Sequence, residues 1–226
     1  MRVLVIGAAG DVGRGVVAAC LKRDWVTVAA GRTASSLEGL VADRNDARLT
    51  AITGSLDSEQ ATSDLAEAVD LAEVGAVVVT VSARWAPQPA ADCGWDTMVT
   101  TFERLLRPHV NAAKILIPRL SPGATYLAVG GGMADAVFPG MAPVSMVQAA
   151  QRNLIRAWHK ENRGTGVHIR ELMISAMVNG HSTREQAGPD WLTDIEIGER
   201  AAQIIADPES NRGPVLSFSV QDRATV

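Results

Sequence analysis

Residues 1–15 read MRVLVIGAAGDVGRG. A short apolar run over Arg2–Ile6 leads into glycines spaced three apart, and an amphipathic helical pattern follows over Asp11–Arg23. In such a strand–turn–helix the first glycine allows a tight turn, the second allows a diphosphate to approach the backbone, and the third allows close helix–strand packing. Backbone amides at the start of the helix favour negative charge. We therefore predict a dinucleotide-binding turn whose cofactor contacts are Gly7, Ala9, Gly10, Asp11, Val12 and Gly13.

Apolar runs alternate with amphipathic segments along the whole chain, as in a parallel sheet covered on both faces. The predicted strands are Arg2–Ile6, Trp25–Ala30, Leu49–Thr53, Ala76–Ser82, Thr125–Val129, Val167–Ser175 and Val215–Val220. The predicted helices are Asp11–Arg23, Ser35–Asp43, Asp57–Ala72, Trp95–Ile117 (bent or broken around Pro108), Val144–Asn162 and Thr193–Ala206. The pattern predicts an α/β Rossmann-type fold: a doubly wound parallel sheet of about seven strands in three α/β/α layers, formed by residues 1–226 as one domain.

Composition argues against nucleic acid, membranes and metal ions as partners. The 226 residues are 47% hydrophobic and 20% charged, and the net charge of −4 includes no basic block, which argues against nucleic acid as a partner. No uncharged apolar run reaches the ~20 residues of a membrane helix. The first strand begins at residue 2, so we expect no signal peptide. Two cysteines, Cys20 and Cys93, indicate a reducing, cytoplasmic location, with Cys20 buried. His109, His159 and His168 have no partners at metal-ligand spacing, so we expect no metal.

The end of the second strand indicates which nicotinamide cofactor binds. NAD sites usually place an acid here to bind the ribose hydroxyls. This chain instead reads Ala29-Ala30-Gly31-Arg32-Thr33. Arg32 could pair with a 2′-phosphate, and Thr33 could add a hydroxyl. We therefore predict NADP(H).

Several motifs together resemble the short-chain dehydrogenase/reductase family over nearly the full length. They are the glycine turn, Gly31-Arg32, Gly54-Ser55-Leu56-Asp57, Val81-Ser82-Ala83, Asn111, and the segment from Gln148 to Leu154. The resemblance implies that Ser55, Leu56, Ser82 and Ala83 lie along the adenine and ribose, and we add Arg84 to this set. It also implies that the turn after strand six places Met177 and Val178 against the nicotinamide.

The chain departs from the family at the catalytic residues. Familiar members use a Ser, a Tyr-x-x-x-Lys pair and an Asn; the Tyr donates a proton and the Lys lowers its pKa. Here Gln148 falls at the Lys position and Val144 at the Tyr position, while the Ser position falls within Gly130-Gly131-Gly132. Asn111 alone matches, and Gln148 could still bind ribose hydroxyls. The resemblance is thus to an atypical member that lacks the Ser, Tyr and Lys.

The single tyrosine, Tyr126, does not replace the missing acid. It falls in the fifth predicted strand, where we expect it to pack in the core with its hydroxyl bonded locally. Candidate catalytic residues are Asn111, His181, Asp135 and Ser145. Predicted substrate walls are Trp85, Met133, Phe138, Met141 and Trp191, which suit a hydrophobic or aromatic small molecule.

The leading hypothesis is an NADPH-dependent, ketoreductase-like oxidoreductase that uses direct hydride transfer, with the proton supplied by the substrate or by water. Tyrosine-lacking ketoreductases of aromatic polyketides and the flavin/biliverdin reductases resemble this arrangement. The alternatives are an isomerase, cyclase or dehydratase that binds NADP(H), or a non-redox sensor of the cofactor. In the family, the helices that here carry Asn111 and Gln148 often pair between subunits, so a homodimer or homotetramer is expected by analogy.

Overall fold

The computed structural model describes residues 1–82 and 85–225. Its main strands are β1 (Arg2–Ile6), β2 (Val26–Gly31), β3 (Leu49–Thr53), β4 (Ala76–Val79), β5 (Thr125–Gly131), β6 (His168–Ile174) and β9 (Val215–Phe218). Its helices are α1 (Asp11–Lys22), α2 (Ala34–Arg44), α3 (Glu59–Val69), α4 (Trp95–Leu105), α5 (Arg107–Leu116), α6 (Ala142–Glu161) and α7 (Asp194–Ala206). These elements confirm the predicted alternation of strands and helices.

The seven strands form one parallel sheet in the order β3-β2-β1-β4-β5-β6-β9. The chain winds one way from β1 to β3 and the other way from β4 to β9, so the order reverses between β1 and β4. In doubly wound sheets, ligands bind beyond the carboxyl ends of the strands at this reversal. The topology therefore points to the ends of β1 and β4, beside the glycine turn.

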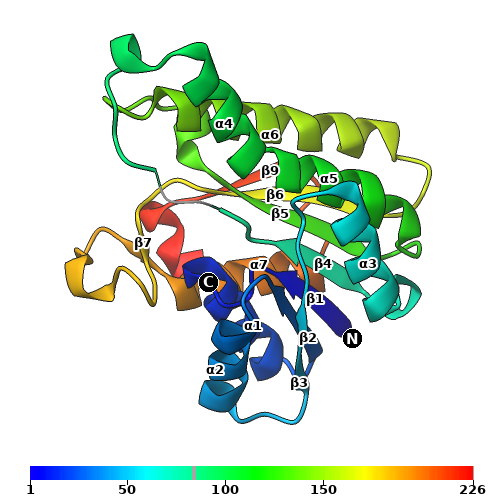
Figure 1. Ribbon diagram of the computed structural model, residues 1–226. Helices are drawn as coiled ribbons and strands as arrows, with labels where there is room; N and C mark the ends of the chain where they lie inside the picture. Colours follow the sequence, from blue (N-terminus) through cyan, green and yellow to red (C-terminus); the bar gives the residue numbers. More distant parts are fainter. Residues whose placement is uncertain (83–84, 226) are drawn as a thin grey trace.

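Helices cover both faces of the sheet (Figure 1). One core packs α1, α2 and α7 against the sheet, through residues such as Val17, Leu40 and Ile204. The other core packs α3, α5 and α6 through residues such as Leu65 and Leu116. The three predicted layers are confirmed. Cys20 lies fully buried in the first core, where burial raises the pKa of its thiol to about 12.

The break expected near Pro108 in the predicted helix Trp95–Ile117 is confirmed, because α4 ends at Leu105 and α5 begins at Arg107 with Pro108 in its first turn. Other predicted boundaries were wrong for identifiable reasons. Strand β5 continues through Gly130 and Gly131, beyond its predicted end at Val129, because its ladder with β6 extends to Gly131 and Ile174. Two short strands that were not predicted, β7 (Val178–Asn179) and β8 (Leu192–Thr193), pair with each other.

Helices α1 and α7 approach until their backbones touch. A Cβ on Gly15 would overlap the Asp194 carbonyl, and one on Gly198 would overlap the Gly15 carbonyl. Helix α7 begins with a complete capping box between Thr193 and Glu196, which fixes its start. The start of α7 is therefore held directly against the helix that follows the glycine turn.

Candidate functional site

A cleft of about 720 Å³ lies where the topology places it, at the carboxyl ends of β1 to β4. Its lining contains predicted cofactor contacts and other residues that were not among the predicted contacts. The predicted residues in its lining are Gly7, Ala9, Gly10, Asp11, Val12, Arg32, Thr33, Ser55, Leu56, Ser82 and Val178. The additional ones are Ile6, Gly31, Ser36, Leu37, Gly54, Asp57, Thr80, Val81, Ser182, Thr183 and Gln186.

The glycine turn is shaped by close backbone contacts. Gly7 has φ = +83°, a conformation that side chains disfavour, and a Cβ there would lie 2.7 Å from the Thr80 hydroxyl oxygen. That hydroxyl lies 3.0 Å from the Ile6 carbonyl oxygen and 3.1 Å from that of Gly7, so it ties β4 to the turn. Gly13 does not line the cleft; a Cβ on it would lie 2.7 Å from the Ala8 Cα. The tight turn at Gly7 and the close packing at Gly13 therefore each depend on a specific contact.

At the end of β2 the cleft is lined by an exposed cation and by the start of a helix. The Arg32 side chain is 68% exposed, and its guanidinium lies 3.8 Å from the Asp57 carboxylate, an exposed pair of small energetic value. Thr33 is the N-cap of α2, but its side chain makes no cap hydrogen bond, and Ser36 lies in the first turn. Uncapped amides at a helix start attract anions. A phosphate between Arg32 and Ser36 would find complementary charge.

Asn111 supports the cleft from behind. It is 6% exposed on α5, and its side-chain amide donates to the Leu56 carbonyl at 2.7 Å, so it holds the segment after β3 in place. Two residues earlier, the fully buried ring of His109 contacts the Val81 carbonyl through Nε2 at 3.2 Å. Burial lowers the pKa of His109 to about 4, so this histidine is neutral at physiological pH. Both side chains fix backbone that lines the cleft.

The loop after β6 forms the remaining wall. Val178, Ser182, Thr183 and Gln186 line the cleft from this loop. The Ser182 backbone N–H and hydroxyl donate to the two carboxylate oxygens of Asp11, each at 2.6 Å. The wall is therefore hydrogen-bonded to the first turn of α1. Sequence reasoning missed Ser182 because its partner lies 171 positions away in the chain.

Gln148 does not reach the cleft; it packs against the end of β5. A Cβ on Gly131 would lie 2.5 Å from both the side-chain oxygen and the nitrogen of Gln148. Its Oε1 is buried and has no hydrogen-bond partner among residues 1–82 and 85–225. Val144, at the position of the family's Tyr, is 6% exposed in the core. Met177 is 60% exposed and does not line the cleft either.

The four candidate catalytic residues lie in different surroundings. The Ser145 hydroxyl is buried, with no hydrogen-bond partner in the described part of the chain. Asp135 is mostly exposed and forms an ion pair with Arg152. His181 is exposed in the loop after β6. Within the described residues, no hydrogen bond or ion pair joins any two of His181, Asp135, Ser145 and Asn111, so they do not form a preassembled catalytic group.

One buried acidic residue near the end of β5 was not identified from the sequence. Glu171 on β6 is fully buried, and neither carboxylate oxygen has a hydrogen-bond partner among the described residues. Burial raises its pKa to about 7, while Arg152 and Arg156 oppose the shift. A Cβ on Gly130 would lie 2.5 Å from its Oε1, so the carboxyl group fills the space beside that glycine. The sequence signal was a charged residue within an apolar strand.

The five predicted substrate-wall residues do not line the main cleft. Trp85 lines a second cavity of about 290 Å³ against α4, and its indole N–H donates to the Gly140 carbonyl at 2.9 Å. Phe138 is 57% exposed, while Met133, Met141 and Trp191 are half-buried. Two predicted cofactor contacts, Ala83 and Arg84, lie outside the described residues.

Tyr126 is fully buried, as predicted, and burial raises its pKa. The expectation that its hydroxyl is bonded locally was wrong, because the oxygen has no partner among the described residues.

Within the described chain, no cluster of three or more His, Cys, Asp or Glu side chains could hold a metal ion. No described helix is long and apolar enough to cross a membrane.

Comparison with known proteins gives a clear structural answer. No protein-family model matches the sequence, and no curated protein sequence matches it significantly. Solved structures do match. The closed form of a serine dehydrogenase complexed with NADP+ has a TM-score of 0.84 at 16% identity, covering 96% of this chain and 94% of that chain.

Two further structures agree. The NADPH-bound short-chain oxidoreductase from Pseudomonas aeruginosa PAO1, described as containing an atypical catalytic center, has a TM-score of 0.83 at 19% identity, covering 97% and 95% of the two chains. A mutant short-chain dehydrogenase/reductase from Serratia marcescens has a TM-score of 0.83 at 15% identity, covering 96% and 95%. The chain therefore has the Rossmann-type fold of short-chain dehydrogenases/reductases.

Proposed function

We propose that this protein is an NADP(H)-dependent oxidoreductase that reduces a hydrophobic or aromatic small molecule by direct hydride transfer. The observation that carries the proposal is the cleft itself. It joins a tight glycine turn, an uncapped α2 helix start and the exposed Arg32 along one surface. Structural neighbours that hold NADP+ or NADPH support the same cofactor.

We assign three parts of the cleft to the diphosphate, the 2′-phosphate and the adenine of the cofactor. The amides around Gly10–Val12 would face the diphosphate at the start of α1. Arg32, Thr33 and Ser36 would bind the 2′-phosphate, and the Leu56 segment held by Asn111 would lie along the adenine. A carboxylate specific for ribose hydroxyls is not found at the end of β2, and Asp57 instead approaches Arg32.

When bound, the nicotinamide would supply the hydride, and the protein would supply orientation and exclusion of water. Among the described residues, the two that the resemblance aligns with the Tyr and the Lys supply no phenol and no cation: Val144 lies in the core and Gln148 packs on Gly131. We therefore propose that the proton on the product oxygen comes from the substrate or from water. Asn111, Asp135, Ser145 and His181 stay as candidates that mutation can test.

The cofactor assignment can be tested by equilibrium binding. Arg32→Ala should raise the Kd for NADPH about 10- to 100-fold, the value of one or two charge-assisted hydrogen bonds, and should leave the Kd for NADH nearly unchanged. Arg212→Ala is the matched control, because it removes the same charge from the loop between α7 and β9, away from the cleft. Equal preference for the two cofactors in the wild type would overturn the assignment.

The reaction can be tested by stopped-flow absorbance of protein-bound NADPH mixed with quinones, polyaromatic ketones, imines or flavins. Oxidation by one of these classes supports the reductase. Tight NADPH binding without oxidation by any class would favour an NADP(H)-binding isomerase, cyclase or sensor.

We also propose that the protein is a homodimer or homotetramer and that it is located in the cytoplasm. Sedimentation would measure the oligomeric state.

A further inference from the structure

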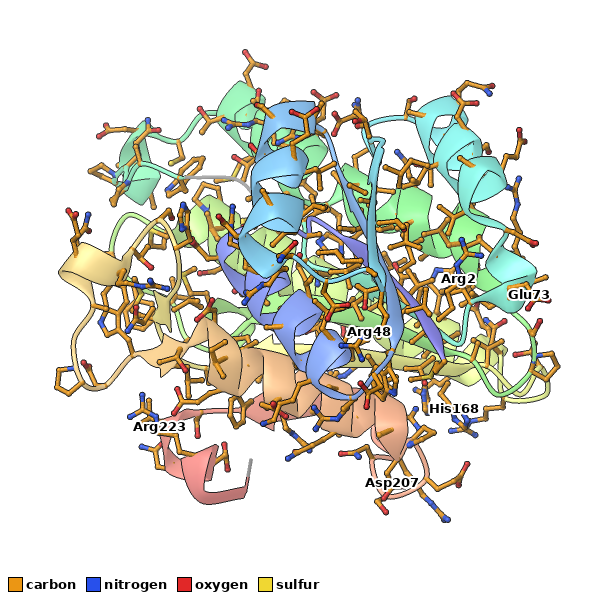
Figure 2. All side chains as sticks on the ribbon, turned by 90° about the horizontal axis from the view of Figure 1, so that it is seen from below. Arg2, Arg48, Glu73, His168, Asp207 and Arg223 are labelled. Carbon is orange, nitrogen blue, oxygen red and sulfur yellow. The ribbon has the colours of Figure 1, made fainter. Side chains whose placement is uncertain are left out.

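The loop between β7 and β8 is held in shape by strand pairing and by internal hydrogen bonds. Pairing of Val178 with Leu192 and of Asn179 with Thr193 brings its two ends together. The Thr183 hydroxyl accepts from the Gly180 amide at 2.9 Å and donates to the Val178 carbonyl at 2.6 Å. On the outer side, Arg223 near the C-terminus donates to the carbonyls of Pro189 and Trp191 (Figure 2, where Arg223 is labelled).

Residues 180–191 contact the glycine turn at one place. Among the described residues, the hydrogen bonds that join this segment to α1 are those from Ser182 to Asp11. Gly180 adds a close approach, since a Cβ on it would lie 2.7 Å from Asp11 Cγ and 2.8 Å from Oδ1. Asp11 is in the first turn of α1, and both Asp11 and Ser182 line the cleft.

This contact places a negative charge where a phosphate would bind. Amides at the start of α1 favour an anion, whereas a free carboxylate beside them repels one. In the structure both Asp11 oxygens accept hydrogen bonds from Ser182, which offset the charge locally. Whether Ser182 is bonded to Asp11 therefore changes the electrostatic potential at the glycine turn.

We propose that residues 180–191 form a cofactor clasp that Ser182 holds closed on Asp11, and that opening the clasp frees the Asp11 carboxylate to repel the cofactor diphosphate. Opening would then both uncover the cofactor and weaken its binding. The inference rests on the proposed function, because it requires a diphosphate at the glycine turn.

Three variants separate charge from contact. Ser182→Ala removes one hydrogen bond to Asp11 and leaves the carboxylate charged, so it should raise the Kd for NADPH about tenfold, mainly through faster dissociation. Asp11→Asn keeps an oxygen for the Ser182 amide and an NH₂ for its hydroxyl, so it should bind NADPH at least as tightly as the wild type. The double variant should recover most of the affinity lost in Ser182→Ala.

Adenosine 2′-monophosphate, which has no diphosphate, should bind all variants equally. Ser121→Ala, whose hydroxyl contacts the Ala72 carbonyl far from the cleft, is the matched control. If the contact were purely structural, the double variant would stay as weak as Ser182→Ala, and this result would overturn the charge mechanism. Unchanged NADPH dissociation in Ser182→Ala would overturn the clasp.

The clasp can also be measured without cofactor. Hydrogen–deuterium exchange of residues 180–191 should be faster in cofactor-free Ser182→Ala than in wild type, and equal rates would contradict the clasp. If the wild type binds neither NADPH nor adenosine 2′-monophosphate, the proposed function fails, while this exchange measurement still reports on the Asp11–Ser182 contact.

Discussion

The glycine turn at residues 7–13 and the strand end at residues 130–132 are both glycine-rich, but their glycines have different neighbours. The space beside Gly13 is occupied by backbone of Gly7 and Ala8. The space beside Gly130 and Gly131 is occupied by side chains, those of Glu171 and Gln148. Backbone cannot be exchanged by mutation, whereas side chains can. We therefore expect substitutions to be tolerated better at the strand end than at the turn.

The strongest test of this comparison is Gly13→Ala. The added methyl would overlap fixed backbone, so we expect a loss of about 3 kcal/mol or more in the free energy of unfolding, with NADPH binding abolished. Urea denaturation and cofactor titration measure both effects. Gly39→Ala is the control: nothing lies within 4 Å of its Cβ position in α2, so the protein should gain roughly 0.5–1 kcal/mol. A well-folded, cofactor-binding Gly13→Ala protein would contradict the account.

The side-chain neighbour of Gly130 gives a pH-dependent test. Between pH 4.5 and about 7, Glu171 is ionised in the unfolded chain but keeps its proton in the folded one, so its contribution to stability falls as pH rises. Glu171→Gln should remove this fall. Relative to wild type, the variant should gain about 2–3 kcal/mol between pH 4.5 and pH 8.

Urea denaturation at several pH values measures this difference. The exposed Glu38→Gln in α2 is the control and should change little with pH. If the stability difference between Glu171→Gln and wild type is constant across this range, Glu171 does not titrate as the structure indicates.

The smallest expected effect concerns Gly131. Gly131→Ser adds a side chain in the segment where the resemblance places a Ser, but it crowds the Gln148 amide, so it should cost about 1–2 kcal/mol of stability. Gly131→Ser combined with Gln148→Ala should recover most of that loss, because the crowded neighbour is a side chain. Additive losses in this double-mutant cycle would mean that backbone, as at Gly13, limits the position.

Local patterns predicted the fold and the turn well. The bounds of β1 and β3 match their predictions. Arg2–Ile6 is a short apolar run that ends at the glycine turn, and Leu49–Thr53 is rich in β-branched residues, which favour strands. The cleft residues nearest the glycines followed from the strand–turn–helix motif. Arg32 also followed, because its position depends only on where β2 ends.

Features that depend on contacts between distant parts of the chain could not be predicted from the sequence. Ser182 belongs to the cleft wall because of Asp11, and no local pattern links two residues so far apart. β7 and β8 are two residues each, too short for an alternating pattern. The proposed substrate walls rested on residue type alone, and the structure places Trp85 at a second cavity. Residue type indicates what a side chain can do, while tertiary packing decides where it does so.

The backbone contact between Gly15 and Gly198 has a consequence for sequence evolution. Neither position can accept a larger residue unless the two helices separate, so substitutions at the two sites should covary. Relatives that retain this crossing would keep both glycines even where the rest of the sequence has diverged. A search that scores this distant pair together with the N-terminal glycine spacing would therefore detect homologues that overall identity does not reveal.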